Sequence, residues 1–400
     1  MAGLTVYSSL PPAVQAYYDK RMLLMAKHSL VAYQFGQKDN TLPAERRTLP
    51  QGKGKTVYFT RYIPLAKQTT ALTETITGGI TRGSEKQLKS VETSATVAIW
   101  GDYVDISTIA QLTSIDPGIK SKVDILATQM SESIDYQVLK TICTGGYRLR
   151  ADNDSTYQVE GTATSGTTTT IVDATNLTQA DDAWNGGFVT VTAGTNYGLT
   201  RKVSDFANAT GTLTVDTAFP AACDTTTQFR VTVGTGVAAS DVVTTANIRR
   251  AKRQLGRNKA LKMPNGYFVG ILDPDLTYDF MGDSEWVNAA TYKDKVESLY
   301  NGEIGKWMGI RFVESTQLYR ESVAGVEQDG TGAVHVLPII GREAYGLVDL
   351  EGQSGTIVIR QPHELGQPLN MSGTVGWQYG WTSLPLNGNW VVNLLCGATA

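Results

Sequence analysis

The segment at residues 52–56 (GKGKT) combines glycine and lysine as phosphate-binding loops do. Such a loop holds phosphate oxygens with backbone N–H groups and a lysine, and a helix follows it directly. Here Leu49 occupies the position of the first glycine in the pattern, and the residues after Thr56 alternate in the manner of a strand. The sequence therefore does not predict a nucleotide site at this segment.

Metal binding or nucleophilic catalysis would require histidine, cysteine or carboxylate residues at defined spacings. The chain has three histidines and three cysteines: His28, His335, His363, Cys143, Cys223 and Cys396. No HxxxH or HExxH pattern occurs, the cysteines share no metal-ligand spacing, and no GxSxG segment precedes a helix. We expect reduced thiols, and histidines without a catalytic role.

A short acidic cluster, DPDLTYD, contains Asp273, Asp275 and Asp279 and could attract a cation. The twelve-residue pattern of a calcium loop is absent, and Asp273 followed by Pro274 fits the start of a helix better. We therefore expect Asp273 to cap a helix. Together, these segments predict a protein that is not an enzyme, with no catalytic residue, no metal ligand and no cofactor.

A basic run begins at Arg249, and no acidic residue occurs from Val242 to Leu272. The run consists of Arg249, Arg250, Lys252, Arg253, Arg257, Lys259 and Lys262. Helical spacing turns Ile248, Ala251 and Leu255 inward and presents a candidate basic face of Arg249, Arg253 and Arg257. This face could contact a phosphate backbone without sequence specificity, or it could be a solvated face or meet an acidic patch on a neighbour.

The length, composition and charge of the chain limit the classes of protein to which it can belong. Four hundred residues with 41% hydrophobic content allow two or three folded domains and exclude global disorder. A formal charge of -3 argues against a dedicated nucleic-acid binder. The N-terminus lacks an apolar signal core and no run of eighteen apolar residues exists, so we expect folding in a cytoplasm and no membrane partner.

The element that organises the chain is a long helix predicted over residues 115–146. Asp116-Pro117 is a start signal and Gly145-Gly146 is a stop signal. One apolar stripe runs between them: Ile119, Val123, Leu126, Met130, Ile134, Val138 and Ile142. We expect Val123, Leu126, Met130, Ile134 and Val138 to form its buried core. Such a helix is roughly 40 Å long and spans an ordinary domain.

The segments before this helix predict an arm and a ribbon. A helix is expected over residues 13–35, followed by an extended arm with no core contribution. Residues 55–65 and 92–107 alternate like strands, and a long polar segment separates them. A two-stranded ribbon is marginal alone, and the chain offers it no obvious partner. A neighbouring subunit is therefore expected to cover it.

The segments after the helix differ in class. From residue 152 to residue 233, short strands separated by turns predict a small all-β sandwich or barrel inserted into the main domain. From residue 241 the α/β character returns, with strand patterns at residues 267–273 and in NGEIGKWMGIRFVES, and a helix expected near 291–300. The tail adds strand patterns in AVHVLPIIG, GTIVIR, VGWQYGWTSL and NWVVNLLC.

The succession of HSLVAYQFGQ, GKTVYFTRYIPL, WGDYVDIS, SIDYQVL and NGEIGKWMGIRFVES resembles the major capsid proteins of tailed bacteriophages. More narrowly, the chain is similar to the family typified by the major capsid protein of coliphage N-four. The resemblance covers roughly residues 5–150 and 241–400. It implies an α+β protein with the Hong Kong 97-like capsid fold, which has an N-terminal arm, an extended β-hairpin loop and a long spine helix.

The resemblance also implies a division into domains, which is as follows: an N-terminal arm (1–50), an extended-loop region (51–107), a peripheral domain with the spine helix (108–151), an inserted β-rich domain (152–235), an axial domain (236–350) and a return to the peripheral domain (351–400). The inserted domain departs from the minimal pattern of the family, and we expect it on the outer surface.

The implied function is that of a virion protein, assembled in the bacterial host cytoplasm, whose pentamers and hexamers form an icosahedral head around double-stranded DNA. Implied partners are further copies of the chain, a portal protein, a separate scaffolding protein, a cement or decoration protein, and weak contact with packaged DNA. The candidate assembly contacts are Arg46, Arg47, Arg61, Lys67, Arg82, Glu85 and Lys86. The alternative is a β-rich phage tail or surface binding protein.

Overall fold

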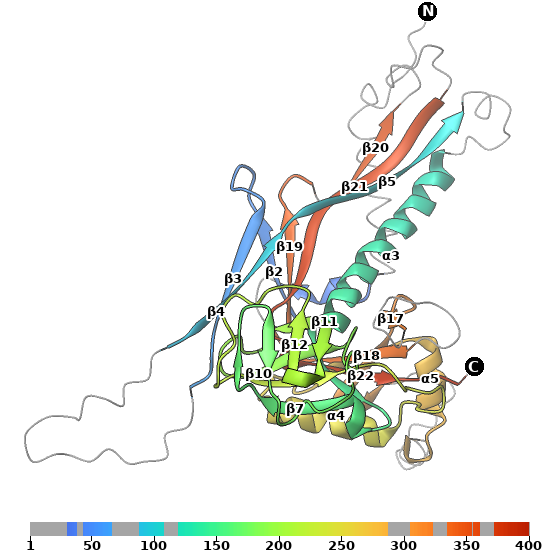
Figure 1. Ribbon diagram of the computed structural model, residues 1–400. Coiled ribbons are helices and arrows are strands. Elements are labelled where there is room, and N and C mark those ends of the chain that lie inside the picture. Colours follow the sequence, from blue (N-terminus) through green and yellow to red (C-terminus); the bar gives the residue numbers. More distant parts are fainter. Residues whose placement is uncertain are drawn as a thin grey trace, which may run out of the picture.

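The computed structural model describes residues 30–37, 43–65, 88–107, 119–286, 305–322, 334–353, 355–360 and 372–399. In Figure 1 these residues form two bodies that one long helix connects. One body is a sheet that runs along the helix, and the other contains two further sheets and two shorter helices.

The long helix, α3 (Ile119–Gly145), has 27 residues. All five predicted core residues are buried, with at most 3% of each side chain exposed: Val123, Leu126, Met130, Ile134 and Val138. The helix ends at Gly145, where a Cβ atom would lie 2.5 Å from the Cβ of Pro385. The predicted start at residues 116–117 lies outside the described residues.

The sheet beside α3 is six-stranded, in the order β1-β2-β19-β21-β20, and β5 pairs with β21. Its strands are β1 (Gly36–Gln37), β2 (Ala44–Leu49), β19 (Tyr345–Leu350), β21 (Ser372–Pro385), β20 (Thr356–Arg360) and β5 (Ala98–Ser107). Trp377, Tyr379 and Trp381 alternate along β21, are buried, and belong to the same hydrophobic core as α3. The Trp377 indole N–H donates to Gln129 Oε1 of the helix at 3.3 Å.

The prediction of an extended arm without a core contribution is wrong for residues 44–49, which form strand β2 of the six-stranded sheet. It lies between β1 and β19 and is parallel to both. Ala44 and Leu49, at its two ends, are buried. The expected helix over 13–35 is also wrong at its end, where a 3-10 turn, η2 (Tyr33–Phe35), leads into β1. Residues 13–29 lie outside the described part of the chain.

The ribbon consists of β3 (Thr56–Tyr62) and β4 (Ser90–Thr96), which pair antiparallel. The single strand expected over 92–107 is two strands, because Val97 interrupts it and its N–H donates to the carbonyl of Lys55. Phe59 of the ribbon packs into a small core with Val348 and Leu384. The described part of the ribbon therefore has a partner within its own chain, contrary to expectation.

Residues 158–232 form a separate seven-stranded antiparallel sheet in the order β7-β13-β10-β11-β12-β9-β8. Its strands are β7 (Gln158–Thr162), β8 (Ser165–Gly166), β9 (Thr170–Val172), β10 (Phe188–Ala193), β11 (Thr200–Ala207), β12 (Thr212–Val215) and β13 (Gln228–Thr232). The strands at its two ends, β7 and β8, are almost consecutive in the chain, so the sheet curls on itself. Trp184, Phe206 and Phe229 are buried in its own core.

The third sheet is seven-stranded, in the order β15-β16-β14-β18-β22-β6, and β17 pairs with β18. Its strands are β15 (Lys306–Trp307), β16 (Ile310–Glu314), β14 (Phe268–Leu272), β18 (Val334–Ile340), β22 (Val391–Cys396), β6 (Tyr147–Arg150) and β17 (Arg320–Glu321). Helices α4 (Thr245–Arg257) and α5 (Pro274–Met281) contribute Ile248, Ala251, Leu255, Leu276 and Phe280 to the same core as this sheet.

Three single 3-10 turns complete the described elements: η3 (Ser155–Tyr157), η4 (Asn208–Thr210) and η6 (Gly388–Trp390). The helix expected near 291–300 lies outside the described residues. Cys143, Cys223 and Cys396 are buried free thiols, as expected. Among the described residues, no helix has the length and apolar character needed to cross a membrane.

Candidate assembly interface

Strand β5 exposes large apolar side chains on both of its faces. Ile99 and Tyr103 point to one side, with 59% and 66% of their surface exposed. Trp100 and Val104 point to the other side and are 41% and 39% exposed. β5 hydrogen-bonds to β21 along one edge. A strand with this composition usually buries at least one face, so β5 is the part of the described surface that most needs a partner.

The outer face of β5, β21 and β20 is hollowed into a groove of about 580 Å³. Val358, Gly376 and Tyr103 form one row across the three strands. A Cβ atom at Gly376 would lie 2.8 Å from the Tyr103 Cβ. Glycine avoids this close contact, and the absence of a side chain deepens the groove at this position. Asp105 and Arg360 also line this groove, which is apolar along its middle.

The ribbon presents a second apolar face. Tyr58 and Tyr62 of β3 are exposed, whereas Phe59 between them is buried against the six-stranded sheet. Alternation along the strand therefore separates an inner face that stabilises the subunit from an outer aromatic face.

Arg46, a predicted assembly contact, takes part in a polar network inside the subunit. Its guanidinium pairs with Asp349 and donates to the Tyr33 hydroxyl at 2.8 Å. Tyr379 donates to the same carboxylate at 2.9 Å. Burial, the neighbouring phenol and the Asp349 charge raise the pKa of the Tyr33 hydroxyl, so it stays protonated. The network joins η2, β2, β19 and β21.

Arg47 and Arg61, two more predicted assembly contacts, also bind within the chain. Arg47 donates to the carbonyl of Tyr58 at 2.9 Å and lies over the Phe59 ring. Arg61 donates to the carbonyl of Tyr197 in the curled sheet, and burial lowers the pKa of Arg61 to about 10. Both arginines therefore hold the ribbon to its own subunit. The other four candidates lie outside the described residues: Lys67, Arg82, Glu85 and Lys86.

A buried carboxylate of α3 fixes the start of the described chain. Asp135 Oδ1 accepts hydrogen bonds from three consecutive backbone N–H groups, of Val31 (3.1 Å), Ala32 (2.7 Å) and Tyr33 (3.1 Å). Burial raises the pKa of Asp135, and these hydrogen bonds partly offset that effect. Asp135 therefore anchors the segment that leads into β1 to the middle of the long helix.

Two arginines of β6, which the sequence reasoning missed, are buried, and one of them, Arg150, joins the third sheet to the end of the curled sheet. Arg148 pairs bidentately with Glu321 at 2.5 and 3.1 Å, and both side chains are at most 1% exposed. Arg150 donates to the carbonyls of Val233 and Thr235 at 2.8 and 2.6 Å. The alternation of arginine in YRLR gives only weak evidence that the two side chains are buried, because arginine usually faces water.

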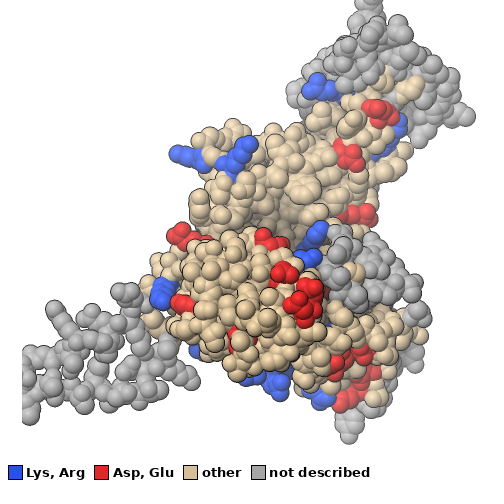
Figure 2. Space-filling view, viewed as in Figure 1, with Lys and Arg blue, Asp and Glu red and all other residues tan. Residues whose placement is uncertain are grey.

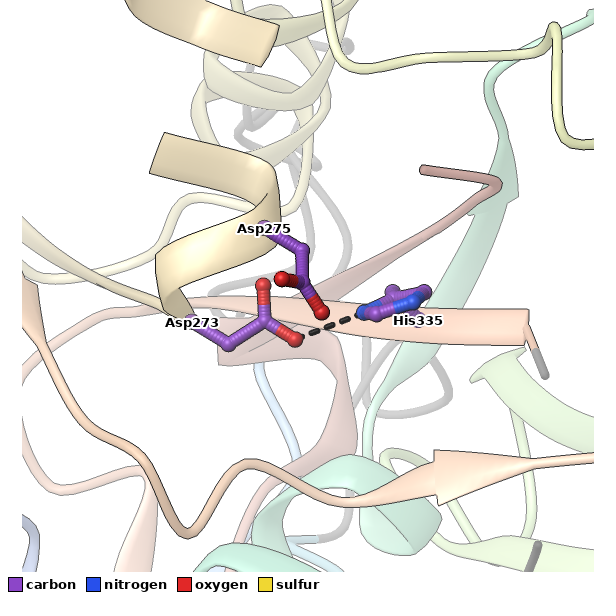
Figure 3. Close-up of side chains that lie close together, drawn as sticks. All are labelled: Asp273, Asp275 and His335. Carbon is purple, nitrogen blue, oxygen red and sulfur yellow. Dashed lines mark hydrogen bonds and ion pairs between the residues drawn. The ribbon is translucent and has the colours of Figure 1, made fainter. Parts of the chain in front are cut away.

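Figure 3 shows Asp273, Asp275 and His335, three potential metal ligands that lie within 4.8 Å of one another. Asp273 caps α5 by accepting from the N–H of Leu276, which confirms the predicted role. His335 Nδ1 lies 2.6 Å from Asp273, and Arg320 pairs with both carboxylates at 3.1 and 3.0 Å. Arg320 contacts both carboxylates and His335 contacts one of them, so the cluster forms an ion-pair network within the subunit.

The pKa of Asp273 reflects this network. Burial raises the pKa, but the hydrogen bond and charge of His335, the N–H of Leu276 and the Arg320 charge outweigh burial and lower it overall. Asp273 is therefore ionised in the folded protein and links α5, β17 and β18.

The candidate basic face of α4 is divided. Arg249, Arg253 and Arg257 are exposed, as the helical spacing predicts. Arg249 pairs with Glu285 at 3.0 Å, on one side of the helix. Arg253 and Arg257, one and two turns further along the same face, line a hollow against the curled sheet. The structure thus brings two of the three residues together.

Comparison with known proteins identifies the fold. The sequence model of the family described as phage capsid protein matches residues 200–333, which is less than half of the chain. A search of curated proteins finds no match. Three of the solved structures that are similar over most of their length are the capsids or heads of phages.

The capsid of cyanophage Pam1 has 15% identity and a TM-score of 0.53, with 91% of this chain and 88% of that chain covered. The capsid of Ralstonia phage GP4 has 12% identity and a TM-score of 0.53, covering 93% and 92%. The head of Helicobacter pylori bacteriophage KHP40 has 12% identity and a TM-score of 0.54, covering 92% and 90%. The predicted fold class is confirmed: the chain has the Hong Kong 97-like fold.

Proposed function

We propose that this chain is the major capsid protein of a tailed bacteriophage, which self-assembles through pentameric and hexameric capsomers into the icosahedral head around double-stranded DNA. The observation that carries the proposal is the apolar exposure of β5 on both faces, in a chain with a capsid fold. The phage capsid family match at residues 200–333 supports the same conclusion.

The physical argument is that the subunit is incomplete alone. Ile99, Tyr103 and Tyr58 expose apolar surface that a second copy of the chain can bury. The face of β5 and the face of the ribbon differ, so contact between them is heterologous and can close into rings. Each subunit in a shell makes several such contacts at once, so each contact can be weak.

We also propose a narrower family, a domain for each sheet and a set of partners for this chain. The motifs quoted above favour the coliphage N-four-type family. The six-stranded sheet with α3 corresponds to a peripheral domain, the third sheet to an axial domain, the curled sheet to an inserted domain and the ribbon to an extended loop. A non-enzymatic role, assembly in the host cytoplasm, a portal, a separate scaffolding protein and a decoration protein follow from the same family relation.

The test is negative-stain microscopy and sedimentation velocity of the recombinant chain across salt and protein concentration. We expect rings, tubes or closed shells. The double variant Ile99→Ser/Tyr103→Ser should remain folded but lose these particles, because it removes apolar surface that the isolated subunit leaves exposed. Tyr278→Ser, at an exposed aromatic residue of α5, is the matched control and should assemble normally. Equal assembly of both variants would contradict the role of β5.

A further inference from the structure

A basic groove lies where the curled sheet meets α4. The groove has a volume of about 330 Å³, and its lining includes Arg230 of β13 together with Arg250, Arg253 and Arg257 of α4. Figure 2 shows Lys and Arg side chains gathered along the lower edge of the molecule, where α4 lies in Figure 1.

Two of these arginines are held in place by the fold. Arg230 donates to the carbonyl of Arg148 at 3.0 Å and pairs with Glu160 at 2.8 Å. Arg250 donates to the carbonyl of Arg150 at 3.2 Å and also to Asn153. Backbone carbonyls and neutral amides accept the N–H groups of Arg250, so its positive charge has no paired carboxylate, whereas Glu160 pairs with Arg230.

The other two arginines are free to close over a ligand. Arg253 and Arg257 are exposed and make no hydrogen bond or ion pair with another described residue. Glu160 is the one acidic residue that lines the groove, and Arg230 and the Tyr147 hydroxyl already engage it. The nearby Asp152 is paired with Arg150. Four guanidinium groups therefore face a single carboxylate in a chain whose formal charge is -3.

Crowding of like charges at this site is also visible in Arg250. Burial lowers its pKa, and the neighbouring positive charges of Arg230 and Arg253 lower it further. An anion in the groove would relieve this repulsion. The folded protein therefore carries a site whose electrostatics favour a negatively charged ligand.

The shape of the site indicates the class of anion. Arg250, Arg253 and Arg257 follow one face of α4 over about 10 Å, since a helix rises 1.5 Å per residue. A second polar hollow of about 420 Å³, lined by Gln254, Arg257 and Asn258, continues the groove. A guanidinium binds phosphate bidentately. Leu149 is the one apolar side chain that lines the groove, whereas the centre of a protein interface is mostly apolar, so the groove suits phosphates better than an acidic peptide.

We propose that this groove is a phosphate-binding site, and that its ligand is the phosphodiester backbone of a nucleic acid, which several arginines contact along its length. Binding of this kind is independent of base sequence and weakens steeply with salt. The site adds a ligand to the proposed capsid function and rests on the geometry of one subunit, so it can be tested on the unassembled chain and can fail while shell assembly stands.

The test is fluorescence anisotropy of the full chain with a labelled oligonucleotide, single-stranded and double-stranded, from 50 to 300 mM salt. Inorganic pyrophosphate and polyglutamate serve as unlabelled competitors. The variant is Arg253→Gln/Arg257→Gln, and the control is Arg249→Gln, on the same helix but paired with Glu285. All three residues are exposed, so the variants should fold, which circular dichroism will verify.

We expect the double variant to bind at least about tenfold more weakly at the lowest salt, and its slope of log K against log salt to fall by about 2. The control should change the slope little. Absence of oligonucleotide binding by the wild type at the lowest salt would overturn the proposal. Equal binding by variant and control, or displacement of the oligonucleotide by polyglutamate but not by pyrophosphate, would also overturn the proposal.

Discussion

The burial of α3 can be tested at Ile134, which is 3% exposed, against Ile125 on the same helix, which is 67% exposed. Ile134→Ala deletes buried methyl and methylene groups and leaves a cavity, and changes of this type cost about 2–5 kcal/mol. Ile125→Ala removes little buried surface and should stay within about 0.5 kcal/mol of the wild type.

Ile134→Asp is the sharper perturbation, because it adds an ionised group to the same site. An unpaired buried carboxylate costs several kcal/mol beyond the lost packing, and the sum approaches the total stability of about 5–15 kcal/mol of a folded domain. The adjacent Asp135 is tolerated because three N–H groups bind its carboxylate, a set of donors that position 134 lacks.

The assay is urea unfolding followed by circular dichroism, together with the soluble yield of each variant at low protein concentration, where assembly is suppressed. We expect Ile134→Ala to fold with a lower midpoint, Ile134→Asp to be insoluble or unfolded, and Ile125→Asp to unfold like the wild type. If Ile134→Asp and Ile125→Asp had the same midpoint, the burial assigned to this face of α3 would be wrong.

Three further predictions address other contacts. Deleting residues 68–90 should leave a folded subunit that forms no large particles in the microscope; normal shells would exclude a role for this segment in assembly. Glu321→Gln should cost about 3–5 kcal/mol in urea unfolding because it leaves Arg148 buried without its counter-charge. Since folding lowers the pKa of Asp273, its contribution is present above the unfolded value of about 3.9 and is lost as pH falls through the folded value. Asp273→Asn should therefore flatten the acid limb of the stability curve below about pH 5, and an unchanged limb would count against the network.

The sequence predicted the elements whose signals are local. The core face of α3 follows from apolar residues every three or four positions, and the cap of α5 follows from Asp273 before Pro274. Strand β2 could not be found in this way. Its segment AERRTL has no alternation of apolar and polar residues. The strand is stabilised by its parallel partner β19 and by the carboxylate of Asp349, which lie about 300 residues further along the chain, so no local signal marks it.

The surfaces were harder to predict than the core, for a related reason. The alternation in residues 92–107 predicts a strand with one buried face, but β5 meets the sheet along one edge and leaves Ile99 and Trp100 exposed on opposite sides. The basic groove needs Arg230 beside α4, and that proximity depends on how β13 packs rather than on spacing in the sequence. Arg253 and Arg257 could be predicted to be exposed, but not to face another arginine.

The order of strands within the sheets also bears on how the chain is made. Strand β22 lies between β18 and β6, and β21 lies beside β5. The six-stranded sheet and the third sheet are therefore complete only after the last thirty residues have been synthesised. The curled sheet, at residues 158–232, can fold as soon as it leaves the ribosome. At about 5–20 residues per second, it then precedes β21 by roughly 7–30 s. A chain cut short before β21 lacks the strand that pairs with β5, so we expect incomplete translation products not to present the β5 surface that we propose for assembly.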